Sequence, residues 1–141
     1  MSDKTLATLV LDLLQEIMNE KADTGITEIH FEELTAEPGP LPRVMLSLRE
    51  GAKEERYISG ETLVSFPFAL TLRIQARAEQ DRLDAEEYLR GLTQEFLSRC
   101  MVLESFIAYK KPSSSMVTCL GRTSSFEDWQ VTFDLKYKQR K

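Results

Sequence analysis

Cysteine, histidine and tryptophan are scarce in this chain of 141 residues, which holds two, one and one of them. Cys100 and Cys119 lack the CxxC spacing of zinc and redox sites, and we expect both to be buried thiols in a reducing cytoplasm. His30 lies between Glu28 and Glu32, an alternation more typical of solvated strand residues than of a metal site or a catalytic base. The sequence therefore predicts no metal and no other cofactor.

Motifs for common enzyme chemistry are absent as well. The sequence contains no GxxxxGKS/T, GxGxxG, GxSxG or HExxH, which argues against the phosphate-loop, dinucleotide-binding, serine hydrolase and zinc protease classes. Adjacent glutamates such as Glu86 and Glu87 point to different faces of an element and do not form an acid and base pair. We expect a protein that is not an enzyme, and an enzyme without a recognisable motif stays as a third hypothesis.

Long apolar runs, glycine and proline are also few. The longest apolar stretch, residues 6–14, is interrupted by Thr8 and Asp12 and is shorter than the roughly 20 residues of a membrane span. No small-residue cleavage site follows it, so we expect neither a signal peptide nor a membrane partner. The 42% hydrophobic and 29% charged composition is typical of a folded chain, and its length predicts one domain over residues 1–141.

Basic residues are scarce in the first half of the chain. Residues 1–70 hold 6 basic and 13 acidic groups (−7), and residues 71–141 hold 12 and 10 (+2), for a net charge of −5. Specific nucleic-acid binding depends on clustered Lys and Arg, so this acidic balance argues against it. The exception is the basic end, residues 136–141, where either a solvated strand end or a contact for an acidic partner fits.

Apolar spacing predicts a helix over residues 4–21 and strands over 28–34 and 43–49, separated by the proline-rich loop 35–42. Residues 50–62 are polar and are either a mobile functional loop or a protruding hairpin. A long strand follows over 64–78. Its interruption at Pro67 indicates a sheet edge or a bulge there.

A second helix is predicted over residues 81–101, with Asp81 as its cap and Gly91 packed closely on the sheet. Short strands are expected at 105–109 and 116–120 around a loop at 110–115, and a final alternating strand at 128–137. The predicted fold class is α+β: one antiparallel or mixed β-sheet with two α-helices packed on one face, in a single domain.

The long strand carries Arg73, Gln75 and Arg77 on the face opposite its apolar residues. Such an array suits a polar protein interface and equally a solvated sheet face. Both interpretations stay open at this point.

The order of these elements resembles that of the small tail-terminator and minor-capsid (head-tail joining) proteins of long-tailed bacteriophages and phage-like bacteriocins. The residues that carry the resemblance are the strand at 66–78 (FPFALTLRIQARA), the helix opening at 81–86 (DRLDAE) and the closing strand at 129–137 (WQVTFDLKY). Residues 110–115 (KKPSSS) have no counterpart that the resemblance requires.

The resemblance implies a structural virion assembly protein that terminates tail polymerisation as a hexameric ring and joins the tail to the head connector. Its implied partners are itself, the tail tube protein and the head-tail connector protein, with DNA passing through the ring without specific binding. Its implied location is the virion tail or a phage-like particle, assembled in the bacterial host cytoplasm. A terminator role and a neighbouring connector or neck role stay open.

Only interface candidates follow from the resemblance, because the family's functional positions are contacts between subunits. They are Arg73, Gln75 and Arg77 from the long strand, and Arg56 and Tyr57 from the polar segment before it. The alternative from another class is a small cytoplasmic ligand-binding or adaptor domain of ferredoxin-like type, which would use a concave pocket.

Overall fold

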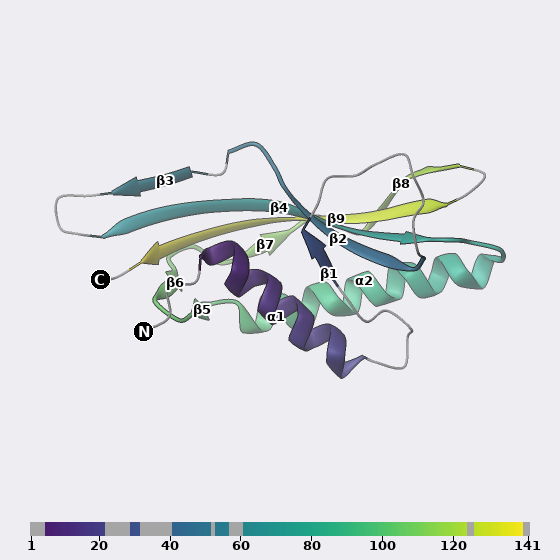
Figure 1. Cartoon of the computed structure of the whole chain (residues 1–141), viewed down its shortest axis with the longest axis horizontal. Helices are drawn as coiled ribbons and strands as arrows, with labels where there is room; N and C mark the ends of the chain where they lie inside the picture. The colour runs from purple at the N-terminus through teal and green to yellow at the C-terminus, as the bar shows by residue number, and fades with distance from the viewer. Residues whose placement is uncertain are drawn as a thin grey trace.

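The computed structural model describes residues 5–21, 29–31, 41–51, 53–56, 61–123 and 126–139. Two helices, α1 (Leu6–Glu20) and α2 (Glu79–Arg99), accompany a sheet of nine strands (Figure 1). The strands are β1 (Ile29–Phe31), β2 (Arg43–Leu48), β3 (Lys53–Arg56), β4 (Thr62–Ile74), β5 (Val102–Leu103), β6 (Phe106–Ala108), β7 (Ser113–Ser114), β8 (Thr118–Arg122) and β9 (Glu127–Gln139).

The helix α1 is amphipathic and capped. The Thr5 hydroxyl accepts a hydrogen bond from the backbone N–H of Thr8 at 3.2 Å, which satisfies one of the amides left free in the first turn. Its buried residues recur at helical spacing, as predicted: Leu6, Leu9, Val10, Leu13, Leu14, Ile17 and Met18.

The helix α2 begins at Glu79, before the predicted Asp81. Ala78 is the N-cap residue, and the Asp81 carboxylate accepts hydrogen bonds from the backbone N–H groups of Arg77 (2.8 Å) and Ala78 (3.0 Å). The prediction of Asp81 as the cap was therefore wrong in position. The carboxylate lies in the first turn and reaches back to the chain before it, where an anion also meets the positive end of the helix dipole.

The sheet is mixed, and the predicted α+β class is confirmed. Its order is β1-β2-β4-β9-β6-β5, with β3 beside β4, and β7 and β8 beside β9. The strands β1 and β2 are parallel, and the other pairs are antiparallel. The sheet has three more strands than predicted. The strand β3 pairs with β4 as a hairpin where a loop was the alternative, β5 follows α2 where no strand was expected, and β7 lies in the predicted loop 110–115.

The strands β4 and β9 pair along their whole lengths, from Thr62 opposite Gln139 to Ile74 opposite Glu127. On the other side of β4, β3 pairs with residues 62–65 and β2 with residues 68–73. Pro67 lies between these two partners, and its carbonyl accepts from Arg49 N–H at 3.0 Å. The strand β4 is therefore interior and has no bulge at Pro67, so the predicted edge or bulge was wrong. The missing amide is tolerated because Pro67 falls in the gap between β3 and β2.

A single hydrophobic cluster joins the two helices to alternate residues of β2, β4 and β9. At its centre Phe133 stacks on Phe68 with ring centroids 4.6 Å apart, and Phe96 of α2 meets Phe133 edge-on at 5.3 Å. In Figure 1 both helices lie below the sheet, and the paired ends of β3, β4 and β9 extend past them at one end. We call this extension the arm.

Two further predictions from the sequence were wrong. Cys119 is exposed on β8, whereas Cys100 is buried. Gly91 does not meet the sheet: a Cβ there would lie 3.5 Å from Lys21 Nζ, beyond the end of α1. Within the described residues, no helix is both long and apolar enough to cross a membrane.

Candidate functional site

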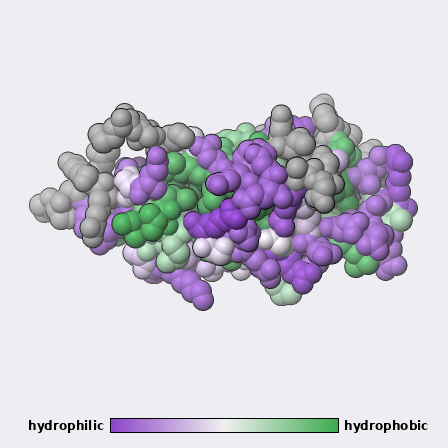
Figure 2. Space-filling view, turned by 90° about the horizontal axis from the view of Figure 1, so that it is seen from below, coloured by the Kyte–Doolittle hydropathy of each residue, from purple (hydrophilic) through white to green (hydrophobic). Residues whose placement is uncertain are grey.

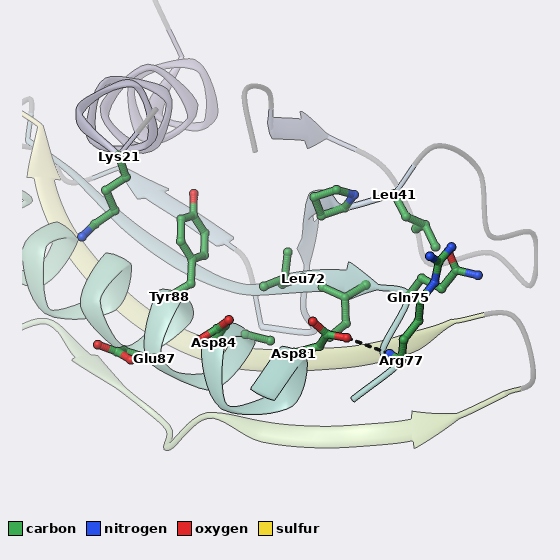
Figure 3. Close-up of a pocket in the computed structure, with 12 residues that line it drawn as sticks. Lys21, Leu41, Leu72, Gln75, Arg77, Asp81, Asp84, Glu87 and Tyr88 are labelled. Atoms are coloured by element: carbon green, nitrogen blue, oxygen red, sulfur yellow. Dashed lines mark hydrogen bonds between the residues drawn. The ribbon is translucent and has the colours of Figure 1, made fainter. Parts of the chain in front are cut away.

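An open groove of about 830 Å³ (Figure 3) lies where β4 ends and α2 begins, at the end of the molecule opposite the arm (Figure 1). Its floor is apolar and consists of the buried residues Leu72 and Ile74 of β4 and Ala85 of α2. Leu41 stands at its upper margin. Acidic side chains along α2 form the lower margin: Asp81, Asp84 and Glu87. This combination of an apolar floor and polar margins suits a binding surface.

Tyr88 is the most unusual residue of this groove. The residue is 8% exposed, and its ring stands up from α2 toward the space between α1 and the sheet (Figure 3). Its hydroxyl oxygen is buried and has no hydrogen-bond partner among the described residues. Burial raises the pKa of Tyr88 to about 12, so the hydroxyl stays protonated and remains a donor near neutral pH. An unsatisfied buried hydroxyl is costly unless something else supplies its partner.

Gln75 and Arg77, two of the predicted interface residues, line the same groove. Both side chains are exposed, and the Arg77 guanidinium donates to Gln75 Oε1 at 3.1 Å. Both residues follow Ile74, the last residue of β4. The strand predicted over residues 64–78 therefore ends before it reaches Gln75 and Arg77. The structure thus places these two residues together, on a connection to α2 rather than on the sheet face.

Arg73 has a different environment from the one expected of a surface residue. Its side chain is 2% exposed, and its Nε and Nη2 donate to the two carboxylate oxygens of Asp128 at 2.7 and 2.9 Å. Its Cζ also lies 3.8 Å from the centre of the Phe126 ring, a cation–π contact. The Arg73 guanidinium therefore makes its contacts within the subunit. Arg73 is a buried structural residue, whereas Gln75 and Arg77 are exposed at the groove.

A second ionic cluster adjoins this pair. The buried Glu127 carboxylate accepts from Arg82 Nε (3.0 Å) and Trp129 Nε1 (2.8 Å), and it also pairs with Arg122 Nε at 3.2 Å. This cluster ties the start of α2 to the hairpin of β8 and β9. One carboxylate shared by two arginines leaves an excess of positive charge at the outer end of β8.

Of the two remaining predicted interface residues, the structure describes only Arg56. Arg56 is the last residue of β3, in the arm, and its backbone position pairs with Thr62. Tyr57 lies outside the described residues. The five predicted residues are therefore not one cluster: Gln75 and Arg77 lie at the groove, Arg73 is internal, and Arg56 lies at the opposite end.

Exposed apolar side chains were missed by the sequence analysis. Toward the end that carries β5 and β6, hydrophobic surface gathers on an otherwise largely hydrophilic helix side (Figure 2). Met101, Val102 and Ile107 are 45%, 59% and 41% exposed at this end, and Val102 pairs directly with Ile107. We call these three residues the β5–β6 patch. Alternation along a two-residue strand is too short to reveal such a surface.

His30 lies on β1, but no group of three His, Cys, Asp or Glu residues within the described part of the chain is placed to hold a metal ion. No protein-family model matches the chain, and no curated protein matches it significantly.

Proposed function

We propose that this protein is a structural assembly protein of a long-tailed phage or phage-like particle. It forms a ring, a hexamer by the family resemblance, on the end of the tail tube, stops tail polymerisation and joins the tail to the head connector. Its partners are a second copy of itself, the tube protein and the connector protein. The proposal includes a single domain in which both helices cover one face of the sheet, and it assigns the protein no catalytic role.

The observation that carries this proposal is the arm. The strands β4 and β9 are each 13 residues long, and their far ends run past the helices with β3 beside them (Figure 1). A strand of about 5–6 residues is typical, so this pair is longer than the helix layer of a small domain requires. Projecting strands of this kind suit contact with a neighbouring subunit.

Further support comes from the separation of the binding surfaces. The groove lies at one end of the long axis and the arm at the other, so they can contact two different partners, such as the tube protein and the connector protein. The β5–β6 patch is a second apolar surface. It adjoins the arm, because β6 pairs with the end of β9.

Electron microscopy tests the proposal. The chain is co-expressed with the products of its flanking genes, and particles are imaged in negative stain at high protein concentration. We expect rings, or tubes of fixed length with a cap that immunogold labelling assigns to this chain. Uncapped tubes beside a monomeric or dimeric chain would contradict the proposal.

The buried Tyr88 hydroxyl favours one other candidate function, a small ligand-binding or adaptor domain. In that case the Tyr88 side chain would turn to bring its buried hydroxyl to a ligand in the groove, and the ligand would accept its hydrogen bond and cover Leu72 and Ile74. Tyr88→Phe removes only the hydroxyl, and Leu83→Ala, a change at an exposed position of α2, is the control.

A screen of small polar ligands by thermal shift separates the two functions. A ligand that stabilises the parent chain and the control, but not Tyr88→Phe, would favour the ligand-binding function. Ring formation that is unchanged in Tyr88→Phe would favour the assembly function.

A further inference from the structure

The strand β8 is an open sheet edge. All five of its residues are exposed, and among the described strands it pairs only with β9. Natural proteins usually protect such edges with short strands, charged residues, proline, bulges or a covering element. The strand β8 has a bulge between Cys119 and Gly121 and ends in Arg122, but it contains neither lysine nor proline, and Leu120 is 50% exposed on it. An edge of this kind favours pairing with another strand.

The opposite margin of the sheet ends in β1, which pairs only with β2 among the described strands. The two margins lie at the same level along the strands. Successive registers place one residue from each strand in a single row: Ile29, Val44, Leu72, Trp129 and Cys119. In a closed ring each subunit is related to the next by a rotation about the ring axis, without any shift along that axis. The two sheet edges that meet must therefore lie at the same height along the axis. The edges β1 and β8 meet this condition.

Strand direction is compatible with the same contact. The strand β1 is parallel to β2, and each step from β2 through β4 and β9 to β8 is antiparallel. Hence β1 and β8 run in opposite directions within one subunit. If the ring axis follows the strands, rotation preserves these directions, and β1 of the next copy meets β8 in the antiparallel sense. Ile29 and Cys119 then oppose each other, with side chains on the same face.

We propose that the ring contact is an antiparallel pairing of the outer edge of β8 with the outer edge of β1 in a second copy, which makes the sheet continuous between subunits. This inference rests on the proposed function. Within one subunit the Ile29 amide donates to Gln15 Oε1 at 3.2 Å. In the proposed register the Ile29 amide faces Cys119 of the second copy, so pairing exchanges its bond to Gln15 for one to the Cys119 carbonyl.

Disulfide cross-linking tests the pairing, because Cys119 is already an exposed thiol and Cys100 is buried. Ile29→Cys is made in the full chain and oxidised under the conditions that give rings or capped tubes. We expect a ladder of covalent multimers on a non-reducing gel, and mass spectrometry should join the peptide containing position 29 to the Cys119 peptide. Directly opposed residues in an antiparallel pair have Cα atoms about 4.5–5.5 Å apart, which lies within the Cα separation that a disulfide spans.

Two controls make the result specific. His30→Cys places the thiol on the other face of β1 and should give no ladder. Ile29→Cys combined with Cys119→Ser should likewise give none.

A second variant leaves Ile29, which packs against the core, unchanged. Leu120→Lys adds a charge to the exposed edge and should weaken assembly roughly tenfold or more, measured by analytical ultracentrifugation. Leu83→Lys, at a leucine that is 56% exposed on α2, is the matched control and should assemble as the parent does.

The remaining outcomes separate this inference from the function on which it rests. Rings without covalent links in Ile29→Cys, together with normal assembly of Leu120→Lys, would overturn the β1–β8 contact and leave the ring function standing. Dimers linked through Cys119 in the parent chain would overturn it in favour of a contact between two β8 strands. A chain that forms no ring and caps no tube would overturn both proposals.

Discussion

Arg73 shows how far a side chain's face on a strand determines its role. Alternation places Arg73 opposite the apolar residues of β4, and this placement is right, since Leu72 and Ile74 join the core and Arg73 does not. The expectation of a surface residue fails because Arg73 opposes Asp128 directly in the register of β4 and β9. The two residues are 55 positions apart, and the sequence does not define that register. The sequence did contain one indication of this ion pair, because Arg73 and Asp128 carry opposite charges on the non-core faces of β4 and β9.

The first prediction concerns this pair. Arg73→Ala leaves the Asp128 carboxylate, 12% exposed, without its bidentate partner. Breaking such a buried pair commonly costs about 3–5 kcal/mol, and we expect a decrease of that order in the free energy of unfolding, measured by urea denaturation. Arg77→Ala, at an exposed position, should change it by no more than about 0.5 kcal/mol.

A double variant tests the cause. Arg73→Met with Asp128→Leu removes both charges and should recover much of the lost stability, because no unpaired carboxylate remains. Equal losses in Arg73→Ala and Arg77→Ala would show that the ion pair contributes little.

Asp81 gives a pH-dependent prediction. Hydrogen bonds from the backbone N–H groups of Arg77 and then Ala78 lower the pKa of this carboxyl below its ordinary 3.8. A lowered pKa in the folded state stabilises the protein above about pH 4, and that stability is lost as the pH falls through the lowered value. Asp81→Asn should therefore be less stable than the parent at pH 6, and the difference should shrink toward pH 3 in urea denaturation. A difference that grows on acidification would contradict the assigned hydrogen bonds.

At the scale of elements, long periodic segments were predictable and short ones were not. The helices and the strands β2, β4 and β9 carry enough turns or alternations for their period to be recognised. The strands β5 and β7 have two residues each, which define no period, and they form only because β6 and β9 offer them an edge. The start of α2 was misplaced because an acidic residue suits both the cap and the third position of a helix.

Gly91 in α2 leads to a prediction of increased stability. A Cβ at this position would meet only Lys21 Nζ at 3.5 Å, the end of a flexible side chain. Glycine within a helix costs about 0.5–1 kcal/mol relative to alanine, so Gly91→Ala should raise the free energy of unfolding by about that amount.

Gly51 is the internal contrast for this prediction. Its φ is +99°, a conformation that side chains disfavour, so Gly51→Ala should destabilise the protein. Thermal unfolding followed by circular dichroism should move the midpoints of the two variants in opposite directions. A lower midpoint for Gly91→Ala would mean that α2 needs the bare surface there.

At the scale of the whole molecule, the candidate site could be predicted only in part. Gln75 and Arg77 were identified as surface residues and do lie at the groove. Tyr88 was not identified, because helical spacing marks it as a core residue and gives no sign that its hydroxyl lacks a partner. The level shared by β1 and β8 depends on four successive registers, none of which periodicity supplies.

The last prediction follows from the single core that joins both helices to the sheet. Phe133 contacts Phe68 of β4 and Phe96 of α2, so Phe133→Ala should open a cavity between the layers and cost roughly 3–5 kcal/mol. If the chain unfolds as one unit, far-ultraviolet circular dichroism and the fluorescence of Trp129, the only tryptophan, should report the same transition. Phe133→Ala should shift both signals to lower urea together, while Met116→Ala, at a position 84% exposed, should shift neither. Separate midpoints for the two signals would mean that the helices and the sheet unfold independently, and that residues 1–141 are not one cooperative domain.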